Sequence, residues 1–147
     1  MTDLVFEISA ISDNPGRVTV KAKNFSMIID EPPSLGGTDQ GPNPMEYLLA
    51  SLAGCLNVVG HIVASEMKIN IEKLSIEISG NLNPDKLFGK ESNDRAGFKS
   101  INVVMNISTD ADIEKLKKWV EEVEKRCPVT DNLRNPTKVN IEFRKTE

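Results

Sequence analysis

The feature that most constrains the fold is residues 43–68, which predict one long helix without a polar face. Asn43 can serve as its N-cap, Pro44 suits the first helical position, and Glu46 stands where a capping box places an acid. The apolar residues that follow occupy nearly every face: Leu48, Leu49, Leu52, Leu56, Val58, Val59, Ile62 and Val63. A helix that is apolar all round must be surrounded by protein. One sheet in a chain of 147 residues cannot enclose it, so we expect a second copy of the chain to contribute.

The residues before this helix carry strand patterns. Residues 5–11 and 18–22 each alternate apolar and polar side chains, and the turn-forming residues 12–16 separate them. A period of two on both sides of a turn predicts a hairpin, and we expect a third strand over residues 26–29. The connection to the helix, residues 31–44, holds four prolines and three glycines and is predicted to be a loop.

The second half of the chain predicts two more strands, a second helix and a last strand. Strand patterns cover residues 74–78 and 101–107, with the polar and mobile connection 83–97 between them. An amphipathic helix is expected from 110 to 127, where the next residue, a proline, stops it. Residues 139–143 alternate again. The order β-β-β-α-β-β-α-β predicts an α+β fold with antiparallel sheets around a long central helix.

Length and composition fit a single domain over residues 1–147, with 39% hydrophobic and 27% charged residues. The net charge of −4 argues against nucleic acid or an anionic membrane as partners, because both usually demand a basic face. No uninterrupted apolar run approaches the ~20 residues that span a bilayer. The N-terminus also lacks the order of a signal peptide. We therefore expect a cytoplasmic protein.

The candidate chemical groups are Cys55 and Cys127. Two cysteines and one histidine in no ligand spacing make a poor metal set, so we expect neither a metal nor a cofactor. In an intracellular protein a cysteine pair indicates catalysis, redox sensing or no special role. Either cysteine could simply fill the core, because free cysteine is among the most buried residue types. A functional pair requires the two sulfurs to meet in space.

Residues 35–55 (LGGTDQGPNPMEYLLASLAGC) and 126–133 (RCPVTDNL) resemble the OsmC/Ohr family of osmotically inducible and organic-hydroperoxide-resistance proteins. The shared features are a loop that ends in N-P-x-E, a helical cysteine among small residues and a later Cys-Pro. The resemblance implies an intertwined homodimer with its active sites at the subunit interface. It also implies a thiol peroxidase in which Cys55 attacks a hydroperoxide and becomes a sulfenic acid. Cys127 then condenses with it to a disulfide, which an external dithiol reduces.

The thiolate of Cys55 needs help from a positive charge. Burial raises the pKa of a cysteine, and Cys55 stands in mid-helix, far from a helix N-terminus. Cys127 is expected at a helix C-terminus, where the dipole disfavours an anion. The resemblance implies that an arginine near the first hairpin activates the cysteine, and Arg17 is the best-placed candidate. The alternative is that Arg17 is an exposed hairpin residue.

The acid that would hold this arginine is displaced in the present sequence. The resemblance implies an acid directly after Asn-Pro, but Met45 occupies that position and Glu46 follows it. At ~100° per residue, a nine-residue offset points Glu46 to the face opposite Cys55. A capping-box role already explains Glu46. Asp39 or Glu31 could supply an acid instead.

Three functions are compatible with these patterns. The first is a peroxidase of the oxidative stress response that reduces organic hydroperoxides or peroxide. The second is a non-enzymatic OsmC-like protein that binds an apolar ligand or senses oxidants through the same cysteines. The third gives both cysteines a structural role only. His61, six residues after Cys55, is not expected to pair with it inside one subunit. Either a dimer brings the histidine of one chain close to the cysteine of the other, or the histidine has a structural role only.

Overall fold

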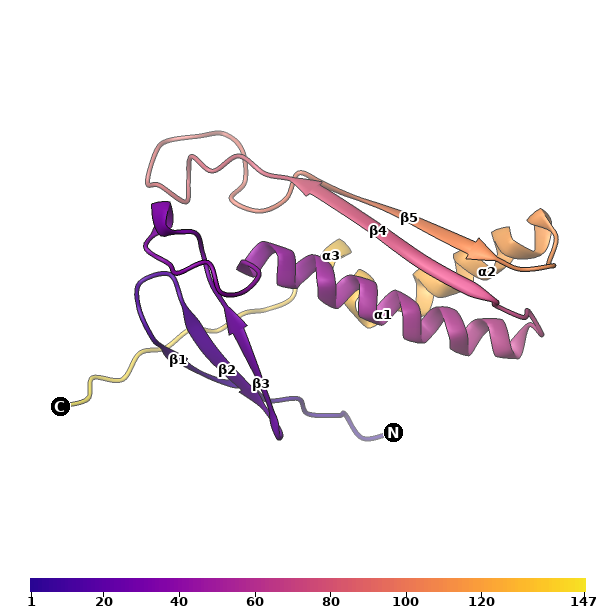
Figure 1. Ribbon diagram of the computed structural model, residues 1–147, viewed down its shortest axis with the longest axis horizontal. Coiled ribbons are helices and arrows are strands. Elements are labelled where there is room, and N and C mark those ends of the chain that lie inside the picture. Colours follow the sequence, from indigo (N-terminus) through magenta and orange to yellow (C-terminus); the bar gives the residue numbers. More distant parts are fainter. The chain divides into compact units, whose positions relative to one another are not determined.

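The hairpin predicted near the N-terminus is present in the computed structural model, which describes residues 1–147 (Figure 1). Strands β1 (Ser9–Ser12), β2 (Val18–Ala22) and β3 (Phe25–Ile29) form an antiparallel sheet in that order. The third strand begins one residue earlier than predicted. The first strand is shorter than predicted, because only the last residues of the segment 5–11 pair with β2.

Contacts within the chain divide it into two compact units, residues 1–50 and 51–147. Helix α1, Pro44–Glu66, starts in the first unit and ends in the second. Its predicted capping box is confirmed. The backbone N–H of Asn43 donates to Glu46 Oε1 at 2.9 Å, and the N–H of Glu46 donates to Asn43 Oδ1 at 2.8 Å. This reciprocal pair satisfies two backbone donors at the helix start.

The loop between β3 and α1 contains a short 3₁₀ turn, η1 (Pro33–Leu35), and is organised by Asp30. The Asp30 carboxylate is fully buried and accepts hydrogen bonds from the backbone N–H groups of Glu31, Thr38 and Gln40. The Thr38 hydroxyl adds a fourth at 2.6 Å. Burial alone would raise the pKa of Asp30, but these bonds hold it far below its ordinary value of 3.8.

The second unit contains the remaining strands and the second helix. Strands β4 (Lys73–Asn81) and β5 (Ser100–Ser108) are antiparallel and pair along their whole lengths. Helix α2, Ile113–Arg126, starts at the N-cap Asp112, whose side chain accepts from the N–H of Lys115 at 2.8 Å. Figure 1 shows β4 and β5 running alongside α1. These elements match the predicted positions.

The core of the second unit lies where α1 meets α2. Trp119 Nε1 donates to the carbonyl oxygen of Gly60 at 2.8 Å, and the Trp119 ring covers the space that a side chain on residue 60 would need. Val63 and Val123 are fully buried beside them. The other buried members of this cluster are Leu52, Leu56, Val59, Ala64, Ile69 and Cys127. One side of α1 is therefore packed within the chain.

Another side of α1 keeps apolar residues exposed. Val58 and Ile62 retain 57% and 46% of their accessible surface. By length and composition α1 could cross a membrane, since an 18-residue window has a mean hydropathy of 1.7; 33% of that window is buried. Core helices of soluble proteins meet the same criterion.

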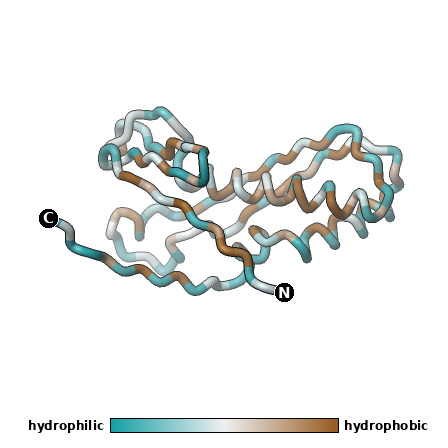
Figure 2. The backbone as a smooth tube through the Cα atoms, turned by 90° about the horizontal axis from the view of Figure 1, so that it is seen from below, coloured by the Kyte–Doolittle hydropathy of each residue, from teal (hydrophilic) through white to brown (hydrophobic).

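The predicted α+β class with antiparallel sheets is confirmed, but its last strand is absent. Residues 139–143 form no strand, and the exposed fractions of Val139, Ile141 and Phe143 are 75%, 92% and 94%. Figure 2 shows the alternation of hydrophobic and hydrophilic residues along this segment. Alternation predicts a strand only where a neighbouring edge can pair with it. A third helix that was not predicted, α3 (Pro128–Arg134), follows α2 instead.

Candidate functional site

The two cysteines meet inside the second unit. Cys55 lies in the middle of α1 and Cys127 at the junction of α2 and α3, 72 positions apart. Their Sγ atoms are 2.9 Å apart, and both thiols are free. The structure thus brings together the pair that a functional role requires. A disulfide between them needs only a small approach of the two sulfurs.

The two thiols differ in exposure. Cys127 is fully buried, whereas Cys55 is partly exposed on α1. A reagent that arrives from solvent therefore reaches the sulfur of Cys55 before that of Cys127. The geometry separates an outer thiol from an inner one.

Cys127 caps two helices at once. Its backbone N–H donates to the carbonyl oxygen of Val123 and ends α2, as predicted. Its Sγ accepts the backbone N–H of Thr130 at 3.4 Å and so begins α3. Cys127 lies at the C-terminus of α2, as expected, but its sulfur also faces the first turn of α3, whose N–H groups favour an anion. The signal that could have revealed α3 is Pro128 followed by Asp131, since proline suits a first helical position and an acid suits the first turn.

This environment shifts the pKa values of the two thiols in opposite directions. Burial raises the pKa of Cys55, and the contact with Cys127 raises it further, against one lowering contact from the backbone of Val129. Burial also disfavours an anion at Cys127. There it is outweighed by hydrogen bonds from Cys55, from the Thr130 hydroxyl and amide, and from Val129, so the pKa of Cys127 is lowered. These opposite shifts favour an anion on Cys127 over one on Cys55.

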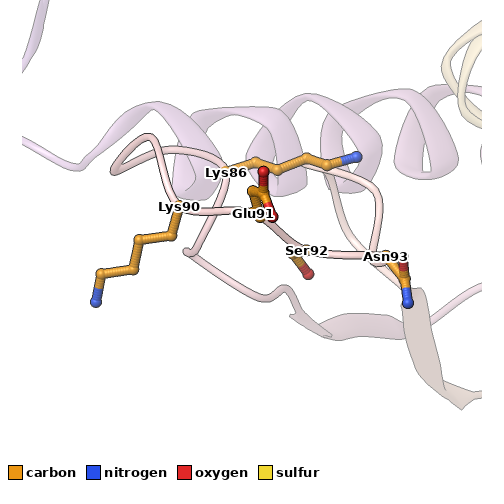
Figure 3. Close-up of a pocket in the computed structure, with 5 residues that line it drawn as sticks. All are labelled: Lys86, Lys90, Glu91, Ser92 and Asn93. Carbon is orange, nitrogen blue, oxygen red and sulfur yellow. The ribbon is translucent and has the colours of Figure 1, made fainter.

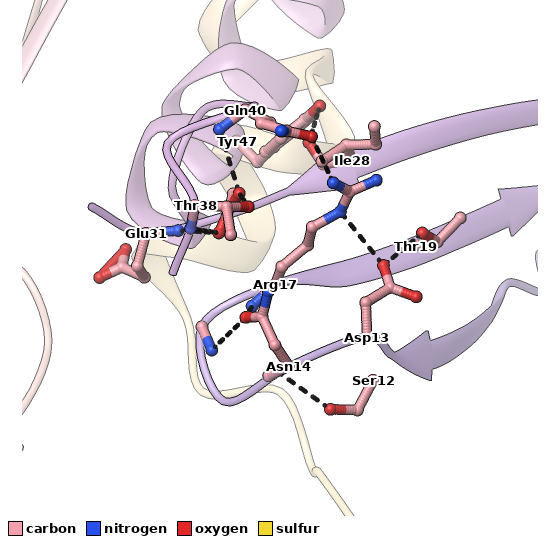
Figure 4. Close-up of polar contacts among 12 residues, drawn as sticks. Ser12, Asp13, Asn14, Arg17, Thr19, Ile28, Glu31, Thr38, Gln40 and Tyr47 are labelled. Carbon is pink, nitrogen blue, oxygen red and sulfur yellow. Dashed lines mark hydrogen bonds and ion pairs between the residues drawn. The ribbon is translucent and has the colours of Figure 1, made fainter. Parts of the chain in front are cut away.

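Arg17, the predicted activating residue, is held firmly in the first unit (Figure 4). Its Nε lies 3.3 Å from Asp13 Oδ2, and its Nη1 donates to Gln40 Oε1. Its backbone N–H donates to Asn14 Oδ1 at 2.8 Å. Arg17 is therefore a half-buried hairpin residue with fixed partners.

Gln40 reaches Arg17 because the hairpin turn and the following loop touch each other. A Cβ on Gly16 would come within 2.6 Å of the Gly37 Cα, so the turn approaches the loop more closely than a side chain allows. Asp30 fixes the loop from the other side by accepting the N–H of Gln40 at 3.0 Å. No sequence pattern had singled out Asp30 or Gln40, because their roles depend on this contact.

The acid that pairs with Arg17 is Asp13, which sequence reasoning missed. Glu46 is engaged in its capping box, and the structure shows no ion pair between Arg17 and Glu46, Glu31 or Asp39. Thr19 donates a further hydrogen bond to Asp13 Oδ2 at 2.6 Å. Arg17 and Glu46 belong to the first unit and the thiols to the second, so a role of either residue at Cys55 stays a prediction.

His61 bonds within its own helix. Its Nδ1 lies 2.9 Å from the carbonyl oxygen of Asn57, one turn earlier on α1, and the residue is exposed. This contact gives the histidine a local structural partner.

A shallow, open depression lies in the connection between β4 and β5 (Figure 3). It is lined by Lys86, Lys90, Glu91, Ser92 and Asn93, and neither cysteine contributes to it. No three His, Cys, Asp or Glu side chains are grouped so that they could hold a metal ion. The cysteine pair is therefore the arrangement with the clearest chemical capacity.

Comparison with known proteins gives concordant matches. The family model described as OsmC-like protein matches residues 37–142. A hydroperoxide reductase of Mycoplasma genitalium is 27% identical over 143 residues, which cover 95% of each chain. An OsmC-like protein from Mycoplasma pneumoniae superimposes with a TM-score of 0.80 at 24% identity, over 92% of this chain and 91% of that one. An organic hydroperoxide resistance protein from Elizabethkingia anophelis gives 0.70 at 20% identity, with coverages of 92% and 91%.

Proposed function

The chain belongs to the OsmC-like protein family, and from that premise we propose that it reduces hydroperoxides through Cys55 and Cys127. The observation that carries the proposal is the 2.9 Å contact between an outer and an inner sulfur. The similarity to a hydroperoxide reductase over 95% of both chains supports the choice of substrate. A cytoplasmic role in the oxidative stress response is part of the same proposal.

The proposed cycle uses the difference between the two thiols. Cys55, which solvent reaches first, attacks the terminal oxygen of the hydroperoxide and becomes a sulfenic acid as an alcohol leaves. Cys127 then attacks the sulfur of Cys55, so a disulfide forms and the hydroxyl departs as water. Two electrons from an external dithiol restore both thiols.

Counting thiols tests this function. One equivalent of cumene hydroperoxide should remove both thiols of each wild-type chain and release one alcohol, and an added dithiol should sustain turnover. Cys55→Ser should abolish alcohol release, whereas Cys127→Ser should complete one turnover and stop at the sulfenic acid. Alcohol release that survives in Cys55→Ser would sink the proposal.

The same experiment separates the enzyme from a non-enzymatic OsmC-like protein. Met45 stands where peroxidase members of the family are expected to carry an acid, and this departure favours the second candidate. A sensor would lose both thiols once and slowly, with no multiple turnover in excess dithiol. A protein that only binds an apolar ligand would keep both thiols.

Arg17 completes the proposed site as the cation that favours attack by Cys55. The ion pair with Asp13 and the bond to Gln40 hold its guanidinium in one place and so support such a role. Arg17→Lys retains the charge and Arg17→Ala removes it. A charge effect predicts a slower reaction of Cys55 in Arg17→Ala and partial recovery in Arg17→Lys. Equal rates in both variants and the wild type would exclude it.

A homodimer is the proposed assembly. The exposed Val58 and Ile62 on α1 and the unpaired alternating segment 139–143 are apolar surfaces that a second copy could cover. Light scattering of the wild type should give twice the chain mass. Ile62→Glu should shift it toward one chain mass, while Lys90→Glu in the open depression should not. A monomeric wild type would contradict this assembly.

A further inference from the structure

The disulfide formed in the proposed cycle must be reopened by an external dithiol, and its two sulfurs differ as targets. Thiol–disulfide exchange begins when a thiolate attacks one sulfur of the disulfide and expels the other. The attack runs along the axis of the S–S bond, so the target sulfur must be open on the side away from its partner. The sulfur that meets this condition decides where the mixed disulfide with the reductant forms.

Cys127 is closed to such an attack. It is fully buried and belongs to the core cluster that also contains Trp119 and Val123. Its backbone N–H donates to the carbonyl oxygen of Val123 at 3.1 Å, so the last turn of α2 holds it in place. Turning its sulfur toward solvent would break this turn and pull the side chain out of the core.

Cys55 is open to a thiol from solvent. The residue is partly exposed, and the space beside it is free on the chain's own account, since a Cβ on Gly54 would meet no atom within 4 Å. The two sulfurs already lie 2.9 Å apart, so closing the bond moves them toward each other by only about 1 Å. The difference in exposure between the two cysteines should therefore persist in the disulfide.

We propose that the reductant attacks Cys55 and that Cys127 is the leaving sulfur, so that the mixed disulfide forms on Cys55. This inference rests on the proposed function, because it concerns the disulfide of that cycle, and it adds the atom to which the reducing partner is joined. The backbone N–H of Thr130 donates to Cys127 Sγ at 3.4 Å. This donor stabilises the negative charge that the leaving sulfur acquires.

The exchange balances with a dithiol as the one co-reactant. An ionised thiol of the dithiol attacks Cys55 Sγ, the S–S bond of the protein breaks, and its electron pair goes to Cys127 Sγ. The second thiol of the partner loses its proton and attacks the partner's own sulfur in the mixed disulfide. That bond breaks, and Cys55 leaves with the electron pair and takes up a proton. The partner keeps both oxidised sulfurs as its own disulfide.

A monothiol tests the assignment, because it lacks the second thiol and stays on the sulfur that it attacked. Wild-type protein is closed to the disulfide with diamide, treated briefly with 2-mercaptoethanol and quenched with acid. The freed thiol is then alkylated with N-ethylmaleimide in denaturant, and peptide mass mapping locates both labels. Cys127→Ser and Cys55→Ser, labelled in denaturant, supply the reference masses for adducts on Cys55 and Cys127.

The adduct should lie on Cys55 and the alkyl label on Cys127. Loss of the α2 hydrogen bond alone should disfavour attack on Cys127 by about tenfold or more. The matched control is the same disulfide in guanidinium chloride, where both sulfurs are accessible and the adduct should divide between them. A folded protein that carries the adduct mainly on Cys127, or divides it as the unfolded chain does, would overturn the inference. A chain that diamide cannot close to the disulfide would overturn it as well.

Failure of the proposed function looks different. Diamide forms the disulfide without a hydroperoxide, so the position of the adduct does not depend on peroxidase activity. A protein that releases no alcohol from cumene hydroperoxide but carries the adduct on Cys55 would contradict the proposed function and support this inference. An active protein with the adduct on Cys127 would do the reverse.

Discussion

Oxidation of Cys55 and Cys127 should make the protein more stable, and the structure sets the size of the gain. The perturbation is one equivalent of hydroperoxide, which joins two sulfurs that already lie 2.9 Å apart. The new bond closes a loop between positions 72 apart, so it removes conformations from the unfolded chain. Because the sulfurs start in contact, the folded state should accept the bond with little distortion.

The magnitude follows from the length of the loop. In the chain-entropy account of a disulfide, a loop of this length raises the free energy of unfolding by about 4 kcal/mol. For a chain of about this size each kcal/mol moves the melting temperature by about 2–4 °C. The oxidised protein should therefore melt about 8–16 °C above the reduced protein.

Thermal unfolding of reduced and oxidised samples measures this difference. The two samples need the same protein concentration, because any assembly makes the melting temperature depend on it. Intact mass and thiol counting should confirm the disulfide first, and Cys127→Ser serves as the control whose melting temperature should not rise. An oxidised sample that carries the disulfide but melts at or below the reduced one would refute the reasoning, since the sulfur contact would then demand distortion.

Three further predictions concern the framework of the two units. The Asp30 pKa is depressed when folded, so its stabilisation is full above the ordinary value of 3.8 and is lost as the pH falls below it. Asp30→Asn should therefore lower the urea midpoint at neutral pH and weaken the loss of stability below 3.8. Trp119→Phe should cost at least about 1 kcal/mol in urea unfolding, because the bond to Gly60 is lost. Asn43→Ala should cost about 1 kcal/mol, and Glu46→Gln should cost little because an amide oxygen can still accept the Asn43 N–H; equal costs would contradict the capping role.

The elements that sequence reasoning found were those with local signals. Asn43, Pro44 and Glu46 marked the start of α1, and the alternation on either side of residues 12–16 marked the first hairpin. The missing last strand shows the limit of such signals. The alternation of residues 139–143 is real, but pairing depends on a neighbour that lies outside the segment.

The residues of the site likewise divide into those that a local sequence motif marks and those that only the three-dimensional contacts reveal. Cys55 and Cys127 could be named because each lies in a recognisable motif, but their contact joins positions 72 apart and no local pattern encodes it. Asp13 and Gln40 were missed as partners of Arg17 because their positions follow from the approach of the hairpin turn to the loop. The N–H groups that favour an anion at Cys127 were missed because Pro128 was interpreted only as the end of one helix and not as the start of another.

The double capping role of Cys127 ties a short piece of backbone to the redox state. In the reduced protein the Thr130 amide donates to a sulfur that favours the anion; in the disulfide the same sulfur is neutral and accepts more weakly. Oxidation should then loosen the first turn of Pro128–Arg134 while it raises the free energy of unfolding of the whole protein. The Thr130 amide would exchange its hydrogen faster in the more stable form. A reductant would thus meet a locally opened helix beside the bond that it must break.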